Sequence, residues 1–202
     1  MVRTAILGAT GAVGHEMIHT LEQRHFPCTS LRLLASPRSA GRRLPFRGRL
    51  LEVEPVGEES FKDIDLVLSS AGGSVSKKWL PVAVEAGATC VDNTSAYRME
   101  KDVPLIVPEV NPDAMANHGG IISNPNCSTI QMVVALWPIQ KEVGIKRLVI
   151  STYQAVSGKS GKAIGEMFTQ VRQLLSGQTD EMEFAEFPHQ IAFNALPHID
   201  VF

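Results

Sequence analysis

The sequence predicts an α/β protein built on a doubly wound, mostly parallel sheet. Short, β-rich apolar runs alternate along the chain with longer amphipathic runs, which is the pattern of parallel strands joined by helices on both faces of a sheet. A glycine-rich turn, GATGAVG, separates the first apolar run from the first amphipathic one. The chain has 202 residues, of which 44% are hydrophobic, and can therefore bury one sizeable core or two small ones.

The predicted elements alternate in order along the chain. Strands are expected where β-rich apolar runs end in small or polar residues, at 2–8, 31–36, 63–71, 88–93 and 119–123. Helices are expected where apolar residues recur at helical spacing, at 12–25, 76–87 and 128–143, followed by a strand at 145–157. Pro81 should lie near the first turns of its helix, and Pro138 should kink or end the helix that contains it.

Composition and charge exclude several classes of protein. The net charge of −2 gives no sign of a nucleic-acid or anionic-membrane partner. No apolar run approaches the roughly 18 to 20 residues of a membrane span, and the N-terminus enters the glycine turn without a signal-peptide region, so we expect a cytoplasmic protein. Cys28, Cys90 and Cys127 are odd in number and far apart, which predicts reduced thiols and neither a disulfide framework nor a metal site.

The turn GATGAVG predicts a dinucleotide site of the Rossmann type. It departs from the commoner GxGxxG, but its glycines still permit a tight turn and close backbone approach. The N-terminus of the following helix offers free N–H groups to a pyrophosphate. We expect the cofactor to contact Gly8, Thr10, Gly11, Ala12 and Val13. A plain strand-to-helix turn is the alternative while the motif stands alone.

Residues after the second strand favour NADP over NAD. An NAD site usually places an acidic residue about 20 residues beyond the glycines, to hold the ribose hydroxyls. This sequence has Ser36, Arg38 and Ser39 in that region, which suit a 2′-phosphate, whereas Arg42 and Arg43 better fit a solvated basic loop.

A second cluster of small residues, SSAGGS, closes the strand at 63–71 at the same expected edge of the sheet. Small residues there would leave room for the cofactor's ribose and nicotinamide, through Ser70, Ala71 and Gly72. A flexible turn without a ligand is equally consistent with this cluster on its own.

Cys127 stands between a turn and a long apolar segment, in the stretch ISNPNCSTIQ. This places its sulfur at or near a helix N-terminus, where unpaired N–H groups and the positive end of the helix dipole favour a thiolate. Cys127 is therefore the predicted nucleophile. Cys28, in a loop after Pro27, and Cys90, within an apolar strand, are expected to be structural.

Eight motifs, in this order and spacing, resemble the aspartate-β-semialdehyde dehydrogenase family. They span nearly the whole chain: GATGAVG, ASPRSAG, SSAGG, VDNTSAYR, VPLIVPEVN, NPNCST, TYQAVSG and FNALPHID. The related N-acetyl-glutamyl-phosphate reductases would carry NPGCY around the cysteine, and glyceraldehyde-phosphate dehydrogenases SCTTN; neither is present.

The resemblance implies NADP-dependent reductive dephosphorylation of L-aspartyl 4-phosphate to L-aspartate 4-semialdehyde through a cysteine thioester, in the pathway to lysine, threonine, methionine and diaminopimelate. It makes Cys127 the nucleophile and Gln154 the residue that orients the intermediate, although Gln154 could instead be a buried amide paired to backbone. It implies phosphate binding by Arg98 and Asn126, and cofactor contacts at Ser157 and Gly158.

The resemblance also implies a domain plan: an NADP-binding domain at 1–126, then the first part of an α+β catalytic and dimerisation domain at 127–202, in a homodimer with no metal. The family's catalytic histidine and substrate-carboxylate arginine match no residue here, and His189 and His198 are not expected to replace them. We therefore expect this chain alone to bind NADP weakly and to be inactive. A nucleotide-binding homologue without catalysis, or an enzyme acting on another acyl phosphate or thioester, remains an alternative.

Overall fold

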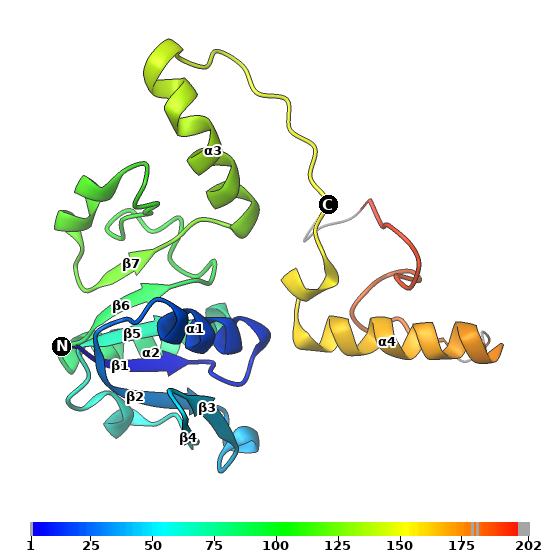
Figure 1. Ribbon diagram of the computed structural model, residues 1–202, viewed down its shortest axis with the longest axis horizontal. Helices are drawn as coiled ribbons and strands as arrows, with labels where there is room; N and C mark the ends of the chain where they lie inside the picture. Colours follow the sequence, from blue (N-terminus) through cyan, green and yellow to red (C-terminus); the bar gives the residue numbers. More distant parts are fainter. Residues whose placement is uncertain (1, 179, 181, 198–202) are drawn as a thin grey trace. The chain divides into compact units, whose positions relative to one another are not determined.

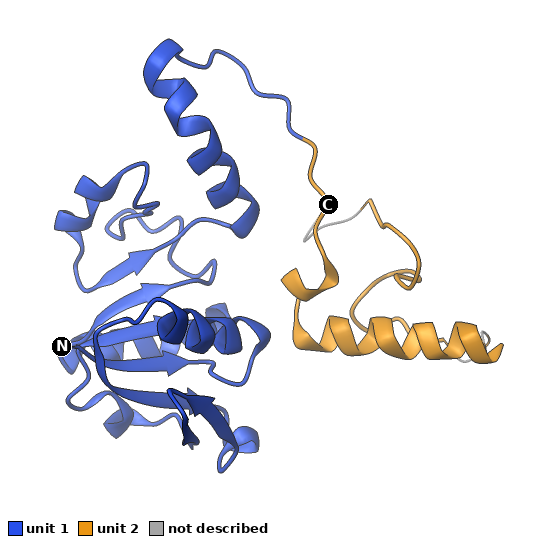
Figure 2. Cartoon of the chain, in the orientation of Figure 1, with its two compact units in different colours: residues 1–150 blue, residues 151–202 orange. Residues whose placement is uncertain are grey.

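The computed structural model describes residues 2–178, 180 and 182–197. The packing of Cα atoms divides the chain into two compact units, 1–150 and 151–202 (Figure 2). This division by packing differs from the functional boundary predicted at 126/127, which stays a prediction.

Within the described residues, a seven-stranded sheet forms the centre of the first unit, in the order β3-β4-β2-β1-β5-β6-β7 (Figure 1). The strands are β1 (Val2–Leu7), β2 (Cys28–Ala35), β3 (Arg43–Phe46), β4 (Arg49–Pro55), β5 (Leu66–Ser69), β6 (Thr89–Asp92) and β7 (Ile121–Ser123). Every neighbouring pair is parallel except β3 and β4, which form an antiparallel hairpin. The predicted mostly parallel sheet is confirmed.

The β3–β4 hairpin lies where the sequence indicated only a basic loop. Leu44 and Phe46 of β3 are buried while the residues between them are exposed, which is the period of a half-buried strand. Positive φ angles at Arg47 (50°) and Gly48 (72°) make the tight turn between the strands, the backbone geometry that matches the twist of a hairpin. Of the two arginines that suggested a solvated loop, Arg43 is an outward-facing residue of this hairpin and Arg42 is the exposed residue just before it.

Two helices cover opposite faces of the sheet, α1 (Ala12–Gln23) and α2 (Gly73–Glu85) (Figure 1). Alternate residues of β1 face them, because successive side chains of a strand point to opposite sides. Ile6 belongs to the core cluster that includes Ile18 and Leu21 of α1. Ala5 and Leu7 belong to the cluster that includes Leu80 and Ala83 of α2. The doubly wound arrangement is therefore confirmed for these elements.

Pro81 lies deeper in its helix than predicted. α2 begins at Gly73, so Pro81 is inside the helix rather than near its start. A proline removes one backbone hydrogen bond, but Leu80 and Ala83 beside it are fully buried, and their packing holds the helix across the gap. α3 (Cys127–Val143) continues past Pro138, so of the two outcomes predicted there the early end is wrong, and the kink stays a prediction.

The strand predicted at 145–157 does not form. Residues 144–155 have no regular secondary structure, and Val156–Gly158 make a one-turn helix. A strand needs a partner for its backbone N–H and C=O groups, and no described segment pairs with this one. The apolar pattern alone could not show whether a partner strand is present. Two further one-turn helices are Pro37–Ser39 and Glu58–Phe61, and Pro112–Asn117 forms a 3-10 helix of two turns.

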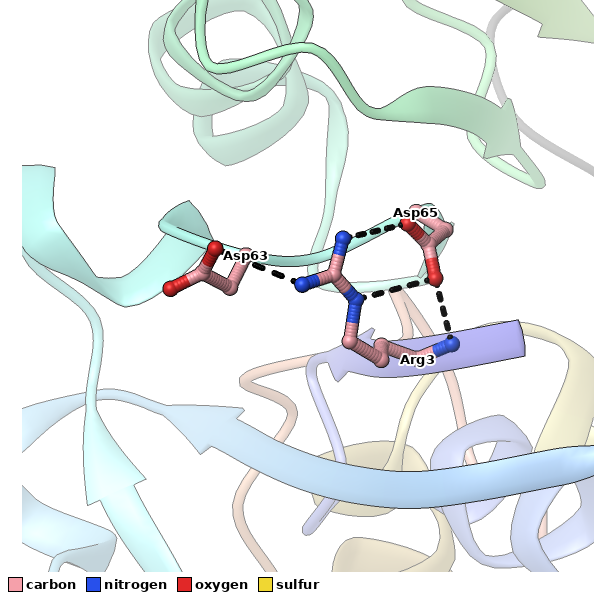
Figure 3. A network of polar contacts seen from close by, with 3 residues as sticks. All are labelled: Arg3, Asp63 and Asp65. Atoms are coloured by element: carbon pink, nitrogen blue, oxygen red, sulfur yellow. Dashed lines mark hydrogen bonds and ion pairs between the residues drawn. The ribbon is translucent and has the colours of Figure 1, made fainter. Parts of the chain in front are cut away.

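An ion-paired cluster joins β1 to the segment that leads into β5 (Figure 3). The Arg3 guanidinium donates to both carboxylate oxygens of Asp65, with Nη2–Oδ1 at 2.7 Å and Nε–Oδ2 at 3.1 Å, while Nη1 contacts Asp63 at 3.3 Å. The backbone N–H of Arg3 also donates to Asp65. These hydrogen bonds lower the pKa of Asp65 from its usual 3.8 to about 2.

The second unit contains the segment from residue 151 with the short helix Val156–Gly158, then α4 (Gly161–Ser176) and the loop that follows it. Ser160 caps the helix by accepting the Ala163 N–H, and Gly177, with φ of 74°, ends it in the left-handed conformation. The Glu166 carboxylate accepts the backbone N–H groups of residues 185–187. The buried Gln170 accepts those of residues 191 and 192. Two side chains one helical turn apart therefore hold the loop.

Candidate active site

The predicted site residues of the first unit follow neighbouring parallel strands at one edge of the sheet. Ser69 is paired in register with Leu7 on one side and Asp92 on the other, and Asp92 is paired with Ser123. The loops after these residues therefore leave the sheet at its carboxyl edge, which is where open α/β sheets bind ligands.

The glycine turn between β1 and α1 has the close packing that the motif predicts. Gly8 has a φ of 94°, and a Cβ there would lie 2.8 Å from the backbone nitrogen of Ala71. A Cβ on Gly14 would lie 2.2 Å from the Gly8 carbonyl oxygen, so this glycine lets α1 pack directly against the turn. Gly11 caps α1 without any side-chain hydrogen bond, which leaves the first N–H groups of the helix open to an anion.

Two predicted cofactor loops contact this turn. The Thr10 hydroxyl lies 3.3 Å from that of Ser39, so the turn meets the loop after β2. Gly8 also lies close to Ala71, in the loop after β5. Gly72 of this loop has a φ of 99° and caps α2 without a side-chain hydrogen bond. Arg38 is exposed, in the one-turn helix that follows β2. The structure thus gathers the predicted cofactor residues of the first unit.

A buried polar network lies beneath these loops, and the sequence analysis did not identify it. The Asp92 carboxylate is fully buried and accepts three hydrogen bonds, from the Ser76 hydroxyl (2.9 Å), the Thr94 hydroxyl (2.8 Å) and the Thr94 N–H (3.1 Å). Ser76 in turn contacts Ser69 at 2.9 Å. The network joins the ends of β5 and β6 to the first turns of α2. The sequence did carry one signal of this network: the apolar runs that form β5 and β6 each end in a polar residue, Ser69 and Asp92.

Arg98 is held between two strand ends. Its Nη2 donates to the carbonyl of Asn93 at 3.1 Å, and its Nε donates to the carbonyl of Asn124 at 3.0 Å. No hydrogen bond is formed by its remaining nitrogen, Nη1, within the described residues. The guanidinium is therefore fixed in orientation and retains a donor, as an anion site requires.

Cys127 is the first residue of α3, as predicted. Asn126 caps the helix: its side-chain oxygen accepts the N–H (3.0 Å) and the hydroxyl (2.7 Å) of Ser128, and lies 3.7 Å from the Cys127 sulfur. The amide nitrogen of Asn126 is not used in this cap and can still donate to an anion.

The three thiols differ in exposure. Cys127 is exposed, whereas Cys28 and Cys90 are buried. Cys28 is the first residue of β2, so its predicted place in a loop is wrong. Burial, with a smaller contribution from the charge of Asp92, raises the pKa of Cys90 to about 12. A thiol in this state is inert at neutral pH, so Cys127 alone has the surroundings of a nucleophile.

Three predicted site residues, Gln154, Ser157 and Gly158, belong to the second unit. Gln154 is exposed and its amide lies over Gly158, where a Cβ would come within 2.7 Å of the amide nitrogen. Ser157 belongs to the same one-turn helix as Gly158. The Lys159 ammonium lies 4.8 Å from the centre of the Phe187 ring and donates to the Glu186 carbonyl, so it is held by its own unit.

Two histidines, His189 and His198, were not expected to act as the catalytic base, and this stays a prediction. His189 is exposed in the loop after α4, and His198 lies outside the described residues. No cluster of three or more His, Cys, Asp or Glu side chains able to hold a metal ion occurs in the described part of the chain. No helix within that part is long and apolar enough to cross a membrane.

Comparison with known proteins gives one consistent family. The profile "Semialdehyde dehydrogenase, NAD binding domain" matches residues 3–118, and "Semialdehyde dehydrogenase, dimerisation domain" matches residues 136–202. An aspartate-semialdehyde dehydrogenase of Aquifex aeolicus is 55% identical over 204 residues, covering 99% of this chain and 59% of that protein. One of Bacillus subtilis is 48% identical, covering all of this chain and 60% of that protein. The chain thus spans about 60% of the length of these relatives.

Solved structures agree with the sequence relatives. Aspartate semialdehyde dehydrogenase II of Vibrio cholerae, complexed with ASA, matches with a TM-score of 0.95 at 48% identity, over all of this chain and 60% of that one. The enzyme of Candida albicans, solved with NADP, matches with a TM-score of 0.62 at 33% identity, over 72% of this chain and 48% of that one.

Proposed function

The chain belongs to the semialdehyde dehydrogenase family, and on that premise we propose that it carries the cofactor-binding, thiol-bearing part of an aspartate-semialdehyde dehydrogenase. The reaction is the reversible conversion of L-aspartyl 4-phosphate to L-aspartate 4-semialdehyde, in the biosynthesis of lysine, threonine, methionine and diaminopimelate. One observation carries this proposal: the open glycine turn, the fixed Arg98 guanidinium and the exposed Cys127 thiol all follow strands at one sheet edge.

The residues present fit NADP. Two neighbouring helix N-termini without side-chain caps, and a turn in which a side chain at Gly8 would clash, make an anion-binding surface on which a pyrophosphate can approach the backbone. Arg38, Ser36 and Ser39 supply donors for a 2′-phosphate. When bound, the reduced cofactor supplies a hydride. The complex of the Candida albicans enzyme with NADP supports the same choice of cofactor.

Cys127 is the nucleophile of the proposed mechanism. In the biosynthetic direction its thiolate attacks the acyl carbon of aspartyl phosphate, the S–C bond forms, the C–O bond to phosphate breaks and phosphate leaves. The thioester then accepts a hydride and a proton to become a thiohemiacetal, which collapses to the aldehyde and releases the thiol. Arg98 and Asn126 bind the phosphate group in this scheme, and Gln154 orients the thiohemiacetal.

The proposal extends to partners, compartment and domain plan. The substrate is a small molecule, and the complete protein is a homodimer, in accord with the match of residues 136–202 to a dimerisation domain. The two family matches lie on either side of the division that we propose between an NADP-binding domain, 1–126, and a catalytic and dimerisation domain that begins at 127. The described cysteines are all free, which suits the reducing cytoplasm.

The test is phosphate-dependent formation of NADPH from aspartate semialdehyde, measured on a chain extended to the full length of the relatives. We expect activity from the extended chain, none from its Cys127→Ser variant and none from the 202-residue chain alone. NADP binding without activity in the extended chain would favour a non-catalytic nucleotide-binding protein. Activity with a different acyl phosphate only would overturn the substrate assignment.

A further inference from the structure

Asn93, which the mechanism above does not use, contacts three parts of the candidate site. Its side-chain oxygen accepts the Asn124 amide Nδ2 at 2.9 Å, and its own Nδ2 points to the Ser70 hydroxyl at 3.5 Å. Its carbonyl accepts Nη2 of Arg98 at 3.1 Å. One residue at the end of β6 thus touches the cofactor loop, the phosphate-binding arginine and the segment that leads to the nucleophile.

Asn124 connects Asn93 to the turn that carries Cys127. Its N–H donates to the Asp92 carbonyl (3.2 Å), its carbonyl accepts Nε of Arg98 (3.0 Å), and its side chain donates to Asn93. Three of its polar groups are therefore fixed by residues 92–98. Only Pro125 and Asn126 separate it from Cys127, and proline restricts the backbone of that short turn.

The strand end that carries Asn93 is rigid. The Asn93 N–H donates to the Ser69 carbonyl of β5 at 2.9 Å. The preceding residue, Asp92, is fully buried and accepts three hydrogen bonds. Asn93 is therefore held in place by the sheet and can fix the position of the residues that contact it.

We propose that Asn93 is a positioning residue: through Asn124 and Arg98 it holds the Cys127 turn and the phosphate-binding guanidinium in one arrangement with the cofactor loop at Ser70. The phosphate part of this inference rests on the proposed function, whereas the positioning of Cys127 does not. Asn93 itself need not touch substrate or cofactor.

The test is the rate of Cys127 alkylation by iodoacetamide at about pH 7, with and without inorganic phosphate, in the native chain and two alanine variants. Asn93→Ala should slow alkylation about fivefold, because the turn loses its fixed relation to the helix N-terminus. The variant keeps the Asn93 carbonyl that accepts Nη2 of Arg98, but it releases the Asn124 side chain, and the Asn124 carbonyl accepts Nε of Arg98. It should therefore also require about fivefold more phosphate for half-maximal protection. Asn111→Ala is the matched control, because its side chain also makes two hydrogen bonds, to Val107 and Leu105, and none to Asn93, Asn124 or Arg98.

A double-mutant cycle separates positioning from a general loss of stability. If Asn93 acts through Asn124, Asn124→Ala should slow alkylation as Asn93→Ala does, and the double variant should lose no more than either one. Equal alkylation rates in Asn93→Ala and Asn111→Ala, or fully additive losses in the double variant, would overturn the proposal. If Asn93→Ala fails to fold, the comparison of Asn124→Ala with Asn111→Ala decides it by the same criterion.

The phosphate arm distinguishes this inference from the proposed function. Absence of phosphate protection in the native chain, together with slowed alkylation in Asn93→Ala, would reject the phosphate role of Arg98 and leave the positioning of Cys127 standing. Protection in the native chain that Asn93→Ala leaves unchanged would show that the Asn93 side chain does not position Arg98, and would overturn that part of the proposal.

Discussion

Single residues of the candidate site differ sharply in their surroundings, and the cysteines differ most. Cys127 is exposed at the start of α3, whereas Cys28 and Cys90 are buried in the first unit. Alkylation at about pH 6.5 followed by peptide mass mapping should therefore label Cys127 before the other two. Faster labelling of Cys28 or Cys90 would contradict the assignment of the nucleophile.

Arg38 decides the choice between the two dinucleotides. It is exposed, and no acidic residue lies in the first turn of α1 or in the one-turn helix 37–39 to favour ribose hydroxyls. A charge-assisted contact to the 2′-phosphate implies that Arg38→Ala weakens NADP binding by roughly 10- to 150-fold and barely changes NAD binding. Titration calorimetry with both dinucleotides checks this, and equal losses for the two would reject the 2′-phosphate contact. Arg43→Ala, at the exposed start of β3, is the control.

At the scale of elements, the Arg3–Asp65 pair ties β1 to β5 and makes their association depend on pH (Figure 3). The pKa of Asp65 is lowered to about 2, so the folded chain holds the charged carboxylate more strongly than the unfolded chain does. The stabilisation is therefore complete above about pH 5 and is lost as the pH falls towards 2.

Chemical denaturation across this range should show the effect. The difference in unfolding free energy between the native chain and Asp65→Asn should be constant above about pH 5 and shrink as the pH falls to about 2. Asp63→Asn removes a single contact of 3.3 Å and is the matched control, with a smaller difference at every pH. A difference that grows on acidification would contradict the sign of the linkage.

The one-turn helix Val156–Gly158 is built around the absence of a side chain at Gly158. A Cβ there would meet the Gln154 side chain at 2.7 Å, and this flexible side chain can move aside without unfolding the unit. Gly158→Ala should therefore lower turnover of the full-length enzyme about 10- to 100-fold while leaving its melting temperature unchanged. Gly165→Ala, in α4 where nothing lies within 4 Å of a new Cβ, should leave turnover unchanged. A loss of stability in Gly158→Ala comparable to its loss of activity would show a structural role instead.

For the whole molecule, large apolar side chains are exposed in both units. Val149 and Tyr153 of the unpaired segment 144–155 are 82% and 95% exposed, and Phe168 and Leu175 of α4 are 53% and 78% exposed. Apolar surface of this extent promotes association, so sedimentation of the 202-residue chain should show mass that rises continuously with concentration. The chain extended to the relatives' length should sediment as one species. A discrete monomer of the shorter chain would contradict this expectation.

Features that depend on local residue type were predicted from the sequence more successfully than features that depend on pairing between distant segments. The turn at Gly8–Gly14 and the placement of Cys127 followed from residue type and order alone, because glycine conformation and helix ends are local properties. The strand at 145–157 failed because pairing depends on a partner distant in sequence. The contacts of Asn93 escaped for the same reason: Asn93 and Asn124 are 31 residues apart and meet only because β6 and β7 are neighbours.

Labelling of the buried Cys90 thiol can report how often the first unit opens. Its side chain is fully buried in β6, between β5 and the edge strand β7, and its pKa of about 12 keeps it protonated at neutral pH. Reagent can reach this sulfur only in moments when the first unit unfolds locally or globally, so its labelling rate counts those moments. An alkylation experiment on Cys127 can therefore also measure the opening of the first unit. The labelling rate of Cys127 reports the reactivity of an exposed thiol, and that of Cys90 reports how often the interior opens.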